Sequence, residues 1–129
     1  MIARLRNRIA GNREGGFTLI ELLVVLIIIA VLLAIAIPSY LGFKDRAERR
    51  AAQSNVRESV PTAEAYGQDN NGSYVGLNTA ALLAIDPAAQ ATVAGAAPTV
   101  TNFCIQATVG GHTYNFTRSA NVVASGACA

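Results

Sequence analysis

The stretch Gly15-Gly16-Phe17-Thr18-Leu19-Ile20-Glu21 decides the fold, because it leads directly into sixteen consecutive apolar residues, 22–37. A single carboxylate, that of Glu21, stands at the head of this apolar segment. Residues 17–37 number 21 and would extend about 31 Å as a helix at roughly 1.5 Å per residue, close to the thickness of a bilayer hydrocarbon core. The segment is therefore predicted to be a helix that is able to span a membrane.

The segment before this helix is short and basic. Its charged residues are four arginines and one glutamate: Arg4, Arg6, Arg8, Arg13 and Glu14. By the positive-inside rule this end stays in the cytoplasm, and the chain after residue 37 lies outside. A secretory signal carries its small-residue cleavage site after the apolar run, whereas here Gly15 and Gly16 precede it. A cut there would remove the basic leader and leave the apolar helix at the new N-terminus.

The run Gly16-Phe17-Thr18-Leu19-Ile20-Glu21-Leu22-Leu23-Val24-Val25, with Pro38 and Tyr40 downstream, resembles the class III signal of type IV pilins and type II secretion pseudopilins. The resemblance covers about residues 11–45. It implies that a membrane-embedded prepilin peptidase cleaves between Gly16 and Phe17 and methylates the Phe17 amine. It also implies a helical filament of identical subunits, built by an assembly platform with its cytoplasmic ATPase.

The predicted fold class is α+β, with a long N-terminal helix packed on a small antiparallel sheet, which is the lollipop fold that the resemblance implies. We expect three parts. These are a leader removed by prepilin peptidase (1–16), a hydrophobic membrane and assembly helix (17–42), and a C-terminal globular domain that includes the amphipathic half of the helix (43–129). The formal charge of +2 comes from the leader, because residues 17–129 hold six basic and seven acidic side chains.

Beyond residue 42 apolar residues recur mostly at three- and four-residue steps, which predicts an amphipathic continuation of the helix to about Tyr66. The apolar positions are Phe43, Ala47, Ala51, Ala52, Val56, Val60, Ala63 and Tyr66. Pro61 lies inside this pattern, and a proline in a helix interior costs about 3 kcal/mol. We therefore expect a kink or a break near Val60. Residues 67–73 are predicted to end the helix in a turn.

The remaining residues predict short elements. Residues 80–85 are expected to form a helical turn that ends at Asp86 and Pro87, and residues 88–99 a surface loop. Two strands, 100–109 and 113–118, are expected to form a hairpin around Gly110-Gly111-His112. A third strand at 121–124 would complete the sheet against the outer half of the helix.

The two cysteines, Cys104 and Cys128, both lie beyond the predicted membrane segment. Export favours a disulfide between them. It would close a loop of about 25 residues, which is worth on the order of 3 kcal/mol in the chain-entropy model. Two buried free thiols are the alternative. Metal binding is disfavoured, because His112 is distant in sequence and two cysteines alone make no ligand set.

Glu21 has two interpretations. A carboxylate at the edge of an apolar span is a functional candidate, and the resemblance implies that Glu21 pairs with the Phe17 amine of a neighbouring subunit during assembly. Thr18 and Glu21 also have the spacing of a capping box, in which each side chain bonds a free amide of the helix start. The substitution Glu21→Gln separates the two, because a capping box accepts glutamine and charge pairing does not.

Pro38 interrupts the apolar run, and Gly42 follows it within about one turn. A simple kink near the membrane surface is one expectation. Related filaments suggest that the helix between about residue 34 and Gly42 unwinds when subunits leave the bilayer, which would make the fibre extensible. A competing interpretation is that Ala34-Ile35-Ala36 is an ordinary signal-peptidase site, which would release a soluble domain that begins at Ile37.

An enzymatic function and a cofactor are not expected, because His112 lies in a predicted turn with no Ser or Cys paired to it. A calcium site like that of the major secretion pseudopilin needs several carboxylates, and none follows Asp86. DNA capture is left open but not indicated, because Arg118 is the only basic residue after Arg57.

The predicted function is that of a structural subunit of a type IV pilus, serving twitching motility, adhesion or DNA uptake. The alternatives are a minor pilin that acts as a tip adhesin or DNA binder, and a type II secretion pseudopilin. The precursor is expected in the bacterial inner membrane as a single-pass protein with a cytoplasmic N-terminus, and the assembled subunit in an extracellular pilus.

Overall fold

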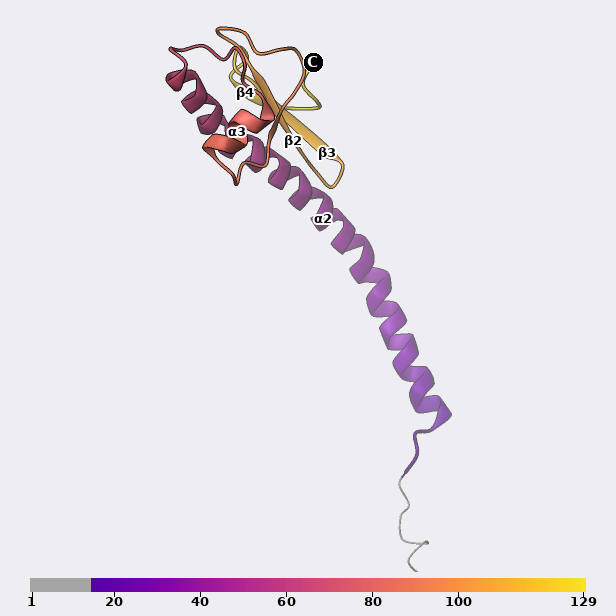
Figure 1. The fold of residues 1–129 in the computed structure, drawn as a ribbon. Coiled ribbons are helices and arrows are strands. Elements are labelled where there is room, and N and C mark those ends of the chain that lie inside the picture. The colour runs from indigo at the N-terminus through magenta and orange to yellow at the C-terminus, as the bar shows by residue number, and fades with distance from the viewer. Residues whose placement is uncertain (1–14) are drawn as a thin grey trace, which may run out of the picture. The chain divides into compact units, whose positions relative to one another are not determined.

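Helix α2, Leu19–Asp69, is the longest element of the chain, and its residues belong to two compact units (Figure 1). One unit ends at Tyr40 and the other comprises Leu41–Ala129. The computed structural model describes residues 15–129. The leader arginines, on which the predicted orientation rests, lie outside the described residues.

The first unit presents the N-terminal part of α2. The most apolar window of this helix has a mean hydropathy of 3.4, and none of it is buried in the structure. By length and composition the helix is able to cross a membrane.

The second unit confirms the predicted α+β class. Four strands form one sheet in the order β1-β2-β3-β4, and every neighbouring pair is antiparallel. The C-terminal part of α2 lies beside this sheet together with the short helix α3 (Figure 1). The elements after α2 are α3 (Thr79–Ile85), β1 (Thr92–Val93), β2 (Cys104–Val109), β3 (His112–Thr117) and β4 (Val122–Ser125).

The core lies between α2 and the sheet. The buried positions of α2 follow one another at steps of one to four residues along one face and are Ala52, Val56, Ser59, Thr62, Ala63 and Gly67. Val56 and Ala63 share a hydrophobic cluster with Ile105 of β2 and Phe116 of β3. Phe103, which is 1% exposed, lies next to the Phe116 ring at 6.0 Å between ring centroids. The amphipathic half of the helix therefore forms one wall of the core, as predicted.

The helix break predicted near Val60 is wrong, because α2 continues through Pro61. Proline cannot donate to the carbonyl of Arg57, four residues earlier. Both Pro61 and Arg57 are exposed, so water can bond the carbonyl that proline leaves free. The cost of the proline is thus lowered by its place on the solvent face.

The helix ends three residues later than predicted, at Asp69 rather than Tyr66. Gly67 lies inside it because the Tyr74 ring packs on this position, where a Cβ atom would come within 2.5 Å of Tyr74 Cε1. Tyr74 is 2% exposed, donates its hydroxyl hydrogen to Glu64, and lies 4.8 Å from the Phe103 ring. Burial raises the pKa of the Tyr74 hydroxyl, and the bond to Glu64 adds to this shift.

The strands also differ from prediction. Strand β2 begins at Cys104 and not at residue 100, because Thr99 and Asn102 bond each other in a local turn, with Thr99 N donating to Asn102 O at 2.8 Å. Strand β1 lies in the segment predicted to be a loop, where Thr92 and Val93 pair with Gln106 and Ile105. Helix α3 and strand β4 lie close to their predicted positions.

The hairpin forms as predicted, but His112 belongs to strand β3 rather than to the turn and pairs with Val109. The turn is the two residues Gly110 and Gly111, whose φ angles of 57° and 84° glycine adopts without strain. A Cβ atom on Gly110 would also collide with the Glu48 carboxylate of α2. The turn therefore lies against the helix.

A short polar cluster joins the hairpin to α2 at this point. His112 Nε2 lies 2.7 Å from Asp45 Oδ1, and Arg49 Nε donates to the other oxygen of Asp45 at 2.9 Å. The hydrogen bond from Arg49 lowers the pKa of the Asp45 carboxyl most, and the bond with His112 also lowers it. The ionised carboxylate is thus favoured in the folded chain.

We expect Gly67→Ala to destabilise the second unit by about 1–3 kcal/mol, because the new methyl group overpacks against a buried ring. Alanine otherwise favours a helix over glycine by about 1 kcal/mol. Gly42, also in α2 but with open space around it, provides the matched control. Thermal unfolding monitored by circular dichroism should show a lower midpoint for Gly67→Ala and no loss for Gly42→Ala. Equal midpoints would contradict the packing of Tyr74 on Gly67.

The lowered pKa of Asp45 leads to a second prediction, which concerns the stability of the fold at acid pH. A carboxyl group whose pKa is lowered by folding stabilises the fold above its ordinary pKa of 3.8, and this contribution is lost as the pH falls through the lowered value. The difference in unfolding midpoint between the parent and Asp45→Asn should therefore be constant above about pH 5 and shrink in the acid range. Asp69→Asn, which removes an exposed carboxylate, should leave the pH profile unchanged. A constant difference down to the lowest pH would refute the assignment.

Candidate functional site

The predicted cleavage site lies in an exposed segment without regular secondary structure. Residues 15–18 precede the first residue of α2, Leu19. A Cβ atom added at Gly15 or at Gly16 would meet no other atom within 4 Å, and Phe17 is 87% exposed. Exposed segments with small residues are favourable sites for proteolysis. The bond between Gly16 and Phe17 is thus accessible, whereas its cleavage stays a prediction.

Thr18 and Glu21 form the capping box at the start of α2. Thr18 Oγ1 accepts a hydrogen bond from Glu21 N at 3.2 Å, and Glu21 Oε2 accepts one from Thr18 N at 3.5 Å. Two of the amides that a helix start leaves without intrahelical partners are satisfied in this way. A carboxylate in the first turn also interacts favourably with the helix dipole. The capping-box interpretation of Glu21 is therefore confirmed by the structure. The hydrogen bond from Thr18 N to the Glu21 carboxylate is long, at 3.5 Å, so the carboxylate can accept a further donor.

The helix that follows exposes its apolar side chains in every direction. Every large apolar residue from Phe17 to Ile37 is between 46% and 87% exposed. Pro38 and Gly42 lie within α2, and the unwinding predicted for them concerns the assembled filament. A continuous apolar surface of this extent is not stable in water and marks a site that lipid or protein covers.

Cys104 and Cys128 are joined by a disulfide, with 6.0 Å between their Cα atoms. Two amide side chains hold the same C-terminal segment. Gln106 Oε1 accepts from Cys128 N at 2.8 Å, and Asn115 Nδ2 donates to Gly126 O at 2.9 Å. Neither amide was predicted from the sequence. The alternation of side chains along a strand could have indicated Gln106, because it places Gln106 on the same face of β2 as Cys104.

Four of the five charged residues of α2 between 44 and 49 pair within the chain, and Arg46 is the exception. Lys44 Nζ lies 3.6 Å from Glu48 Oε1, and Arg49 bonds Asp45 as described. Asp45 also contacts His112, which the sequence placed in the hairpin turn.

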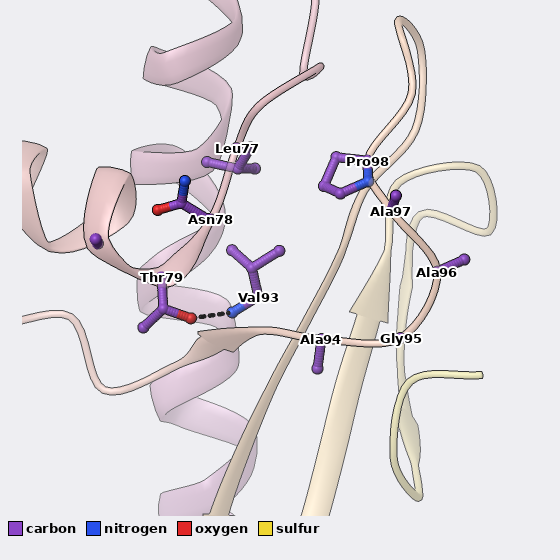
Figure 2. A pocket seen from close by; sticks show the side chains of 10 residues that line it. Leu77, Asn78, Thr79, Val93, Ala94, Gly95, Ala96, Ala97 and Pro98 are labelled. Carbon is purple, nitrogen blue, oxygen red and sulfur yellow. Dashed lines mark hydrogen bonds between the residues drawn. The ribbon is translucent and has the colours of Figure 1, made fainter.

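A groove of about 440 Å³ lies between α3 and the segment that follows β1 (Figure 2). Its lining residues are Leu77, Asn78, Thr79, Ala80, Val93, Ala94, Gly95, Ala96, Ala97 and Pro98. None of these side chains is ionisable. The Thr79 hydroxyl accepts a hydrogen bond from Val93 N at 3.1 Å, which ties α3 to β1. Among residues 15–129 no three His, Cys, Asp or Glu side chains are grouped to hold a metal ion.

A family model described as "Prokaryotic N-terminal methylation motif" matches residues 11–37. The chain is 37% identical over 62 residues to a type II secretion system core protein G of Pectobacterium carotovorum, covering 48% of this chain and 40% of that protein. It is 44% identical over 70 residues to a type IV wide pilus major component of Thermus thermophilus, covering 54% and 52%. It is 36% identical over 74 residues to a type IV major fimbrial protein of Dichelobacter nodosus, covering 55% and 47%.

The chain thus spans about half the length, or less, of these curated relatives. No solved structure shows a significant match to it. The N-terminal segment carries the methylation motif, and subunits of pili and of secretion systems alike match across about half of the chain. Over about half of its length the chain is thus similar to type IV pilins and to type II secretion pseudopilins alike.

Proposed function

We propose that this chain is a structural subunit of an extracellular type IV pilus and that it waits in the bacterial inner membrane as a single-pass precursor. The observation that carries the proposal is the apolar part of α2, which is exposed on all sides of the helix. Lipid can cover this surface in the precursor, and the helices of identical subunits can cover it in a filament. No enzymatic function is proposed for the chain.

Processing would convert the first state into the second. Prepilin peptidase would cut the exposed bond between Gly16 and Phe17 and methylate the Phe17 amine, and the assembly platform with its ATPase would then extract the subunit. Removal of residues 1–16 also removes four of the ten basic side chains of the chain. The mature N-terminus would then be an apolar helix, which fits the interior of a filament.

Glu21 would select the position of each incoming subunit. A carboxylate in an apolar filament interior is strongly unfavourable unless a cation neutralises it. The Phe17 ammonium of a neighbouring subunit is such a cation. The capping box leaves the Glu21 carboxylate exposed, with a single bond of 3.5 Å from Thr18 N. The carboxylate can therefore accept the neighbour's amine without loss of the helix start.

A type II secretion pseudopilin is the second candidate, because the matching relatives include secretion core proteins. Both candidates share the processing and the helix packing described above. They differ in the consequence of deleting the gene. Loss of surface fibres with normal protein secretion supports the pilus subunit, and loss of secretion without loss of fibres supports the pseudopilin.

The substitution Glu21→Gln tests the role of the charge. Glutamine keeps the capping box but cannot neutralise an ammonium group. Breaking a buried charge pair by removal of one partner costs about 3–5 kcal/mol, so the yield of sheared fibres should fall by at least about tenfold. Glu58→Gln is the matched control, because Glu58 likewise accepts a hydrogen bond from a residue about one turn earlier, Ser54 Oγ at 2.7 Å, but lies outside the apolar segment.

The helix content of Glu21→Gln, measured by circular dichroism in detergent, should equal that of the parent chain. Fibre yield at the parental level in Glu21→Gln would refute charge pairing and leave Glu21 with the capping role alone. A low yield in Glu58→Gln as well would show that the assay reports folding rather than pairing.

A further inference from the structure

Three arginines, Arg46, Arg50 and Arg57, lie on one side of α2, which is turned away from its core face. A helix turns by about 100° per residue, so positions four and eleven apart point in similar directions. The same rotation places these positions about a third of a turn from Ala52, Val56 and Ala63, which face the core. All three arginines are exposed.

The three arginines differ from the other cations of the second unit. Lys44, Arg49 and Arg118 each lie within 4 Å of a carboxylate, those of Glu48, Asp45 and Glu64. Arg46, Arg50 and Arg57 form no ion pair with residues 15–129. Asp45 and Glu48, the acidic residues nearest to Arg46 and Arg50 in sequence, pair with other cations. Glu58, which adjoins Arg57, accepts a hydrogen bond from Ser54 Oγ. This face of α2 therefore carries positive charge that the described chain does not balance.

Two of these arginines border a hollow with an aromatic wall. Phe43, Arg46, Ala47 and Arg50 line a space of about 180 Å³, and Phe43 is 65% exposed. An aromatic ring beside basic side chains is the pattern of a helix segment at a membrane interface, where the ring enters the headgroup layer and the cations bond phosphate. Guanidinium groups bond phosphate oxygens through two parallel donors.

The position in the sequence fits the same layer. If Glu21 lies at one boundary of the hydrocarbon core, a core of about 30 Å ends about 20 residues later, near residue 41. Phe43 then lies at the boundary, and Arg46 and Arg50 lie roughly 7 and 13 Å beyond it. Helical side chains lean toward the helix N-terminus, which here is the side of the membrane, so both guanidinium groups reach back toward the headgroups.

We propose that Phe43, Arg46 and Arg50 form a binding site for the phosphate groups of anionic phospholipids on the outer surface of the membrane. This proposal rests on the membrane-embedded stage of the proposed function. The site sets the depth at which the subunit waits in the bilayer. Extraction into a filament releases the lipid, so the site acts only before assembly.

A fluorescent reporter at the site tests the proposal, because the chain has no tryptophan. The full chain carrying Phe43→Trp is reconstituted into vesicles of phosphatidylcholine and phosphatidylglycerol, with bromine on the acyl chains of one lipid or the other. Bromine quenches only at short range, so quenching reports the lipid next to residue 43. We expect brominated phosphatidylglycerol to quench about twofold more than brominated phosphatidylcholine at equal content.

The double substitution Arg46→Gln and Arg50→Gln should abolish this preference. Lys44→Gln with Arg57→Gln removes the same charge but leaves the hollow intact, and it should retain the preference. Equal quenching by both lipids in the reporter chain, or an unchanged preference in the Arg46 and Arg50 variant, would overturn the proposal. An unchanged preference together with a low fibre yield in that variant would assign the face to contacts between subunits instead. Quenching by neither lipid would overturn the membrane stage itself and this site with it.

Discussion

The exposed apolar surface of α2 is the constraint on which the rest of the molecule depends. Between Phe17 and Ile37 no large apolar side chain is less than 46% exposed, and no other part of the described chain covers them. At roughly 25 cal/mol per Å² of apolar area, such a surface is strongly unfavourable in water. It therefore needs a cover of lipid or protein. The capping box at Thr18 and Glu21 begins the helix at the edge of this surface.

The second unit, Leu41–Ala129, has to form a stable domain from few residues. The amphipathic half of the same helix forms one wall of its core, to which it contributes Val56 and Ala63. The unit therefore needs no separate core helix. The disulfide and the amides of Gln106 and Asn115 fix the C-terminal segment to the sheet. Small domains commonly require such covalent support. The free face of the helix then remains available to lipid or to neighbouring subunits.

Features set by local sequence were predictable, and features set by distant contacts were not. Three features follow from periodicity and spacing: the long apolar helix, the hairpin, and the capping box of Thr18 and Glu21. All three are present in the structure. Strand β1 was missed because its two residues form a strand only by pairing with β2, in a segment whose composition indicates a loop. The break at Pro61 was predicted from its intrinsic cost alone, without knowledge that the position faces solvent. His112 was placed in the turn because its contact with Asp45 spans 67 residues of sequence.

The proposed function requires cleavage before the apolar helix rather than after it, since the helix would have to remain on the chain to pack against neighbouring subunits. The most direct test is the intact mass, with N-terminal peptide mapping, of the protein sheared from the cell surface. We expect a chain that begins at Phe17, carries one methyl group on its amine, and retains the disulfide between Cys104 and Cys128. A chain that begins at Ile37 would mean that the apolar helix is discarded as an ordinary signal, and the filament interpretation would then be wrong.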